Sequence, residues 1–148
     1  MLKSIHPIAG GLAILTIATF WLSTVLSELL GSQSTIVAVK TAIPWGFLLL
    51  IPAIAFAAGS GFALAKGHRG GLIGSKVKRM PLVAANGLLI LIPSALYLSF
   101  KANSTSFDTA FYAVQALELL AGAANVTLLG FNMRDGLEIK GRLRRRAA

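Results

Sequence analysis

Four long runs without a charged side chain constrain this sequence more than any other feature. Three of the runs cover residues 7–27, 41–65 and 81–100, and the fourth, the shorter run 110–117, lies in an apolar stretch that also contains Glu118. A helix rises about 1.5 Å per residue, so about 20 residues cross a hydrocarbon layer of roughly 30 Å. The chain therefore predicts four membrane-spanning helices, at residues 8–30, 37–65, 81–100 and 107–132. We expect an all-α fold, an integral membrane four-helix bundle, in which residues 1–148 form a single transmembrane domain.

The apolar runs fit membrane-spanning helices better than three alternatives: the buried core of a soluble protein, a signal peptide and a membrane β-barrel. Only 13% of the residues are charged, about half the share that is typical of soluble domains. Too little polar sequence therefore remains to coat four buried helices. The first run is too long for the apolar part of a signal peptide, and no small-residue cleavage site follows it before Glu28. A membrane β-barrel would show ten-residue segments of alternating hydrophobicity, which the sequence lacks.

The basic residues are distributed unevenly between the two sides of the expected bundle. Four spans place the N-terminus, the 66–80 loop and a basic tail at 133–148 on one side, which holds every lysine and arginine except Lys40 and Lys101. Cytoplasmic segments carry such an excess of positive charge. We therefore expect both termini in the cytoplasm and the protein in the plasma membrane, the inner membrane of a bacterium. On the opposite side, Glu28 and Lys40 flank a short turn, where we expect a surface ion pair.

The high positive charge of the chain is also consistent with a membrane location. The formal net charge is +9, which in a soluble protein would suggest a nucleic-acid partner. A basic cluster beside a membrane helix instead binds anionic lipid headgroups, at about 1 kcal/mol per residue. We expect lipid headgroup contacts, and no nucleic-acid partner, for the arginines of the tail, which are Arg142, Arg144, Arg145 and Arg146.

Polar side chains recur along one face of the fourth expected helix. Gln115, Glu118, Asn125 and Asn132 are separated by three or seven residues, which places them on one side of a helix. This face must meet protein or water, because a carboxyl group that faces lipid costs several kcal/mol. At the depth of Glu118, the first and third helices offer four polar side chains as partners: Thr19, Ser23, Ser94 and Tyr97.

Two roles for this polar stripe remain open. In the first, the stripe only joins helices through hydrogen bonds, with a protonated Glu118 bonded to a hydroxyl and with Asn86 bonded to Asn125. In the second, it forms a ligand or proton site, because ionisable residues inside a membrane commonly mark function. The residues of that site would be Glu118, Gln115, Asn125, Asn86 and Tyr97.

Small residues predict where the helices approach one another. Ala53, Ala57, Gly61 and Ala65 recur at four-residue spacing in the second helix. In lipid, helices associate by close packing, and small residues mark the contact. The ridge predicts a close contact either within the bundle or between protomers.

The two histidines give a hypothesis about a cofactor. His6 and His68 are both expected at the cytoplasmic interface, and the chain has no cysteine. Histidine and methionine are therefore the axial haem ligands that the chain offers, and haem b held by His6 and His68 is one possibility. The alternative is that His6 is an interfacial residue and His68 a solvated loop residue. No further donors accompany them, so we expect no metal site of the zinc type.

Three classes of function follow from these residues. The first, which we favour together with the third, is a bundle that binds haem or a quinone-like molecule. The second is a proton-coupled transporter or channel-like oligomer centred on Glu118. The third is an accessory subunit of a homo-oligomer or of a larger membrane complex. The sequence shows no nucleophile–base pair and no phosphate loop, so we expect a protein that is not an enzyme.

Overall fold

The computed structural model describes residues 2–65 and 71–147, and every element in these ranges is a helix. In chain order they are α1 (Leu2–Leu30), α2 (Gln33–Ala65), α3 (Gly71–Asn86), the π-helical turn η1 (Gly87–Leu91), α4 (Ile92–Asn103) and α5 (Thr109–Ala147). α3, η1 and α4 follow one another without a break. In the described ranges, four stretches are long and apolar enough to span a membrane: Ile5–Leu30, Gln33–Leu64, Gly74–Asn103 and Thr109–Ile139.

The expected four-helix bundle is therefore confirmed as an all-helical fold, but the helices are longer than the apolar runs. α3 begins at Gly71, inside the expected 66–80 loop, and α5 continues through the expected tail to Ala147. The apolar runs mark only the part of each helix that suits lipid. Backbone hydrogen bonding continues beyond that part, because leucine, lysine, arginine and glutamate are all good helix formers.

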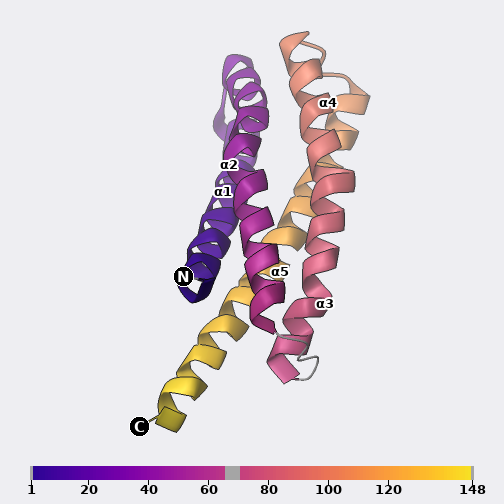
Figure 1. The fold of residues 1–148 in the computed structure, drawn as a ribbon. Coiled ribbons are helices and arrows are strands. Elements are labelled where there is room, and N and C mark those ends of the chain that lie inside the picture. The colour runs from indigo at the N-terminus through magenta and orange to yellow at the C-terminus, as the bar shows by residue number, and fades with distance from the viewer. Residues whose placement is uncertain (1, 66–70, 148) are drawn as a thin grey trace.

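The helices form two hairpins, one of α1 with α2 and one of the continuous α3–η1–α4 helix with α5. α1 packs along α2, α4 packs against α2, and α5 contacts α1, α3 and α4. Figure 1 shows the α1–α2 hairpin beside the α3–α4 helix, with α5 crossing behind both and extending past them toward the C-terminus. We call the end of the bundle that holds residues 31–32 and 104–108 the short-loop end, and the opposite end, toward which α5 runs, the basic end.

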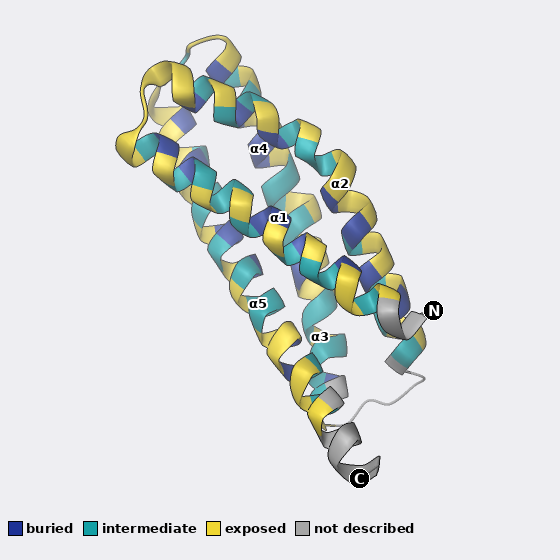
Figure 2. Ribbon diagram, turned by 90° about the vertical axis from the view of Figure 1, so that its left-hand side faces the viewer, coloured by how far each residue is buried: buried dark blue, intermediate teal, exposed yellow. Residues whose placement is uncertain are grey.

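Packing buries small residues together with a few large apolar side chains and leaves many other large apolar side chains on the surface, and small residues at helix contacts are typical of lipid-embedded proteins. One buried cluster joins α1 and α2 through Ala13, Ile17, Leu50 and Ala53. A second lies at the short-loop end and contains Ile36, Leu98, Ala102 and Phe111. Many leucines are exposed instead, and Figure 2 shows exposed residues along the outer faces of the helices.

The small-residue ridge of α2 faces α1 within the same chain. Ala53 and Ala57 are buried, and a Cβ atom on Gly61 would lie 3.0 Å from the His6 ring. The ridge thus lets α1 approach α2 closely inside the bundle. This contact is one of the two alternatives that the four-residue spacing left open.

The π-helical turn has a local cause in the sequence. Pro93 follows η1 by two residues and has no N–H group, so it cannot donate to the carbonyl of Leu89. The N–H of Ile92 bonds to the carbonyl of Gly87, five residues back. Such a turn widens the helix locally and is frequent at functional sites. Its position matters here because Gly87, Leu88 and Leu91 line a cavity.

Candidate functional site

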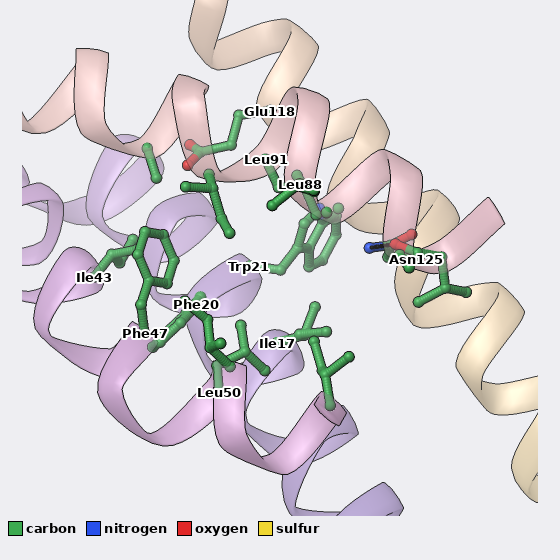
Figure 3. Close-up of a pocket in the computed structure, with 18 of the residues that line it drawn as sticks. Ile17, Phe20, Trp21, Ile43, Phe47, Leu50, Leu88, Leu91, Glu118 and Asn125 are labelled. Carbon is green, nitrogen blue, oxygen red and sulfur yellow. Dashed lines mark hydrogen bonds between the residues drawn. The ribbon is translucent and has the colours of Figure 1, made fainter. Parts of the chain in front are cut away.

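A cavity of about 280 Å³ lies among the four spans. Apolar side chains form most of its wall, including Ile17, Phe20, Ile43, Phe47, Leu50 and Leu91. Four residues with polar groups also line it: Trp21, Thr24, Glu118 and Asn125. In Figure 3, Trp21 lies between Glu118 and Asn125, with the apolar side chains around them. The cavity is therefore an apolar space with a few polar groups at defined positions.

The cavity reaches the apolar outer surface of the bundle between α2 and the α3–η1 segment. Ile51 and Ala55 of α2 line the cavity and are exposed, and so are Ala84 and Leu88 on the opposite side. α2 contacts α3 much less than it contacts α4. Two helices that diverge in this way leave a lateral opening between them.

A buried ion pair stands beside the cavity. The ammonium of Lys40 lies 2.6 Å from Oε2 of Glu118, and the side chains are 1% and 12% exposed. Lys40 also donates a longer hydrogen bond of 3.4 Å to the hydroxyl of Thr24. One ammonium thus joins α1, α2 and α5. Burying either charge alone would be costly, so the pair accounts for the presence of both in spans of a membrane protein.

The expected surface ion pair between Glu28 and Lys40 is wrong. α2 begins at Gln33 rather than at residue 37, which puts Lys40 two turns inside the helix, about 10 Å from its start. Ser32 gives the signal that could have located this start: its hydroxyl accepts a 3.4 Å bond from the N–H of Thr35, as an N-cap serine does. A helix that starts at this cap carries Lys40 into the membrane span.

The partners expected for Glu118 at its depth also prove to be wrong. The hydroxyl of Thr19 is exposed and donates to the carbonyl of Leu15 in its own helix, and Ser23 likewise bonds to Thr19. Tyr97 lies on the surface, where Lys101 sits over its ring at 5.8 Å, and it does not line the cavity. These partners were chosen by their depth along the helices, and depth carries no information about which face each helix turns inward.

The hydrogen bond expected between Asn86 and Asn125 is confirmed. Nδ2 of Asn86 donates to Oδ1 of Asn125 at 2.8 Å and to the carbonyl of Ala121 at 2.8 Å. Nδ2 of Asn125 donates in turn to the carbonyl of Val83 at 3.3 Å. These bonds tie α3 to α5, so the two amides act as interhelical links, and both polar atoms of Asn125 are occupied.

Trp21 positions α1 against α5 in the middle of the cavity wall. Its indole N–H donates a 2.9 Å hydrogen bond to the carbonyl of Leu119. A Cβ atom on Gly122 would lie 2.9 Å from Cδ1 of Trp21, so a glycine is required for the ring to lie this close to α5. Trp21 was not among the residues predicted for the site, although Gly122 lies on the polar face of α5.

Gln115 is buried on the same face, one turn from Glu118. It is 5% exposed, and its Oε1 has no hydrogen-bond partner in the described part of the chain. Gln115 does not line the cavity. The structure therefore places Glu118 and Asn125 in the cavity wall, Asn86 directly behind Asn125, and Gln115 outside the cavity.

His6 lies away from the cavity, at the contact between α1 and α2. Its Nδ1 is 3.0 Å from the carbonyl oxygen of Ala57 and 3.1 Å from the hydroxyl of Ser60. The second expected haem ligand, His68, lies outside the described residues. Within those residues, no three side chains of histidine, aspartate or glutamate lie together as a metal site would need.

A second buried carboxylate lies near the basic end. Arg79 of α3 donates to Asp135 of α5 at 2.6 Å, and the carboxyl of Asp135 is 1% exposed. Asn132, the last member of the polar stripe, donates to the sulfur of Met80 at 3.3 Å. This contact also ties α3 to α5 and was not expected from the sequence. The side chains of Arg142, Arg144, Arg145 and Arg146 lie outside the described part of the chain.

Comparison of the chain with protein-family models, with curated proteins and with solved structures gave no match. The function must therefore be argued from the residues of the cavity. These residues combine an apolar wall, a lateral opening and one carboxylate whose partner is an ammonium in the same bundle.

Proposed function

We propose that this membrane protein binds a small lipid-soluble molecule that carries a hydroxyl group, such as a quinol-like ring. The observation that carries the proposal is the cavity, an apolar space of about 280 Å³ with a carboxylate in its wall. Binding sites for small molecules typically combine an apolar lining with a few placed polar groups. The volume is near the lower limit of such sites, about 300 Å³, which favours a small ring system of one or two fused rings.

Glu118 supplies the group that would select such a ligand. Lys40 occupies Oε2, whereas Oε1 has no hydrogen bond within the described ranges. A ligand hydroxyl is therefore expected to donate to Oε1. Hydrogen bonds to charged groups contribute about 1.5–3 kcal/mol, and Lys40 keeps the carboxylate in one orientation. Asn125 is less suited to this role because its amide is already bonded to α3.

The lateral opening supports a ligand that arrives from the bilayer. The ring would enter between α2 and η1 and lie against Trp21, while an apolar tail would remain among the lipid chains. By the positive-inside rule we place both termini in the cytoplasm, with the arginines of the C-terminal helix at anionic headgroups. In this orientation Lys40 and Glu118 lie in the outer half of the bilayer. We propose no reaction at the site, and the bundle would act alone, as a homo-oligomer or as an accessory subunit.

The two tryptophans allow a direct test of binding. Trp21 lines the cavity and Trp45 is an exposed residue of α2. A Trp45→Phe protein therefore reports on the cavity alone. We expect a short-chain naphthoquinol to quench Trp21 fluorescence in a saturable way. The matched Trp21→Phe protein, which reports from Trp45, should show only the unsaturable quenching that follows partition into the detergent or lipid.

Two adjacent alanines provide the matched control for the site. Ala84 lines the cavity and Ala85 does not, although both are exposed on α3. Ala84→Phe should abolish saturable quenching and Ala85→Phe should retain it. Glu118→Gln should weaken binding about 10- to 100-fold, the loss expected for a charge-assisted hydrogen bond. Equal quenching by the naphthoquinol in the Ala84→Phe and Ala85→Phe proteins would rule the proposal out.

The other functions that the sequence suggested predict different experimental results. A haem protein would show a Soret absorption band that His6→Ala removes. A proton-coupled transporter centred on Glu118 is favoured by one observation, the placement of this carboxylate beside both an ammonium and a cavity. Proteoliposomes would then show substrate movement driven by a pH gradient, and Glu118→Gln would abolish that movement without any change in naphthoquinol binding.

A further inference from the structure

Two buried acceptor oxygens lie one helical turn beyond the Lys40–Glu118 pair. Oε1 of Glu28 and Oε1 of Gln115 are both inaccessible, and neither has a hydrogen-bond partner among the described residues. A buried acceptor without a donor costs about 1–3 kcal/mol. Two of them in one region of a membrane bundle therefore point to a donor or positive charge that the protein takes from outside itself.

Helix geometry places these two oxygens in the same layer of the bundle. Thr24 of α1 and Glu118 of α5 both contact the ammonium of Lys40. α1 runs toward the short-loop end, so Glu28 lies one turn beyond Thr24, about 6 Å along the axis. α5 runs away from that end, so Gln115 lies one turn beyond Glu118 in the same direction. Residues four and three apart share a helix face, so both side chains follow the face that meets Lys40.

The charge balance of this half of the bundle supports a cation. Lys40 neutralises Glu118, and Lys101 neutralises Asp108 through a 2.5 Å ion pair. Glu28 is the carboxylate that remains, and its buried oxygen has no basic partner within the described ranges. The other titratable groups in this half are Tyr97 and Tyr112, which are exposed. Glu28 as a whole is half-buried, and a carboxylate oxygen that is shielded from water is costly unless a positive charge accompanies it.

We propose that Glu28 and Gln115, together with the Lys40–Glu118 pair, form a second site that holds one small monovalent cation at the short-loop end. Glu28 would supply the compensating charge and the Gln115 carbonyl a second oxygen. Oxygen ligands of this kind suit a hydrated alkali cation and a hydronium ion alike. Neither Glu28 nor Gln115, the two proposed oxygen ligands, lines the cavity, whereas Glu118 does line it. Occupation of the second site by a cation therefore does not require a bound quinol.

Cysteine accessibility tests whether water and cations reach this layer. The chain has no cysteine, so each introduced thiol is unique. We expect Gln115→Cys to react with a cationic methanethiosulfonate reagent roughly tenfold faster than with an anionic one, because the local charge attracts cations. Phe111→Cys is the control, since Phe111 is equally buried one turn away in the apolar cluster. Unreactive Gln115→Cys protein, with Ser104→Cys at the surface fully labelled, would overturn the proposal.

Cation-dependent stability identifies the ion. Thermal unfolding is measured in sodium or choline chloride of equal concentration, and in choline over a range of pH. We expect the wild type to gain about 3 °C from the bound cation, Glu28→Gln to gain nothing, and the exposed carboxyl control Glu138→Gln to behave as wild type. A gain in sodium identifies an alkali cation, and a gain only at lower pH identifies hydronium. The same response in the wild type and Glu28→Gln to both sodium and pH would exclude the site.

Discussion

The indole ring of Trp21 lies directly against the backbone of Gly122, where a Cβ atom would be only 2.9 Å from Cδ1 of the ring. This contact brings α1 to α5 and is supported by the hydrogen bond from the indole to the carbonyl of Leu119. Because Trp21 and Gly122 both line the cavity, the contact that joins the two helices also shapes the site.

The first prediction concerns this contact. Gly122→Ala should lower the free energy of unfolding by about 1–3 kcal/mol, because the added methyl group overlaps the ring of Trp21. Gly130→Ala is the matched control in the same helix, since no atom lies within 4 Å of its Cβ position. That substitution should be neutral or stabilising by up to about 1 kcal/mol, as alanine is the better helix former. Denaturation in detergent measures both, and equal stabilities would contradict the packing described for Trp21.

The second prediction concerns the buried ion pair. Lys40→Met and Glu118→Gln should each destabilise the protein by about 3–5 kcal/mol, because each leaves a buried charge without its partner. The double variant should lose much less than the sum of the two single losses, since neither charge remains. Unfolding of all four proteins gives the coupling free energy between Lys40 and Glu118. Additive losses would show that the two side chains do not interact.

The third prediction concerns the amide link between α3 and α5. Asn125→Ala removes the bonds to Asn86 and Val83 and should cost about 0.6–1.7 kcal/mol, the range for interhelical hydrogen bonds in membranes. Thr127→Ala is the control, because Thr127 is an exposed residue of α5 whose hydroxyl bonds to Ala123 in its own helix. Hydrogen exchange should become faster in α3 near Asn86 only in the Asn125→Ala protein. Unchanged exchange in that region would argue against a link through Asn125.

The fourth prediction concerns pH and the 104–108 loop. The ammonium of Lys101, and next the N–H of Phe111, hold the pKa of Asp108 below its ordinary value of 3.8. A carboxyl group whose pKa is lower in the folded state stabilises the fold above its unfolded pKa, and this contribution is lost as the pH falls through the folded pKa. Asp108→Asn should therefore be less stable than the wild type at neutral pH, and the difference should disappear below the folded pKa. Because Asp108 is exposed, the difference should be small and should shrink further in high salt. A difference that persists in strong acid would show another cause.

The positions of the spans and of the polar stripe could be predicted from the sequence, but the partners of the stripe could not. Apolar runs set the four spans because hydropathy and length are local properties. Asn86 and Asn125 could be paired because each is an amide at a matching depth and no other asparagine competes. Glu118 had several hydroxyl groups at its depth and bonds to none of them, because Lys40, its actual partner, was expected at the interface where the second helix begins.

The error at Lys40 has a specific physical origin. We expected α2 to begin at residue 37, near the charge-free run, although the capping serine Ser32 directly precedes Gln33. A shift of four residues at a helix start moves a side chain by about 6 Å along the membrane normal. This distance separates an interfacial lysine, which needs no partner, from a buried lysine, which needs a carboxylate.

The amino-acid sequence alone determined that the chain forms four apolar helices, that small residues mark their contacts and that a carboxyl group lies within a span. Only the tertiary structure decided that Glu118 meets Lys40, that Trp21 rests on Gly122 and that a cavity opens between α2 and η1. Successive side chains along a helix are rotated by about 100°. The depth of a residue in the bundle therefore does not determine whether its side chain points inward. Packing against the neighbouring helices selects that face in α1, α2 and α4, whereas in α5 the polar stripe already marks the side that is buried.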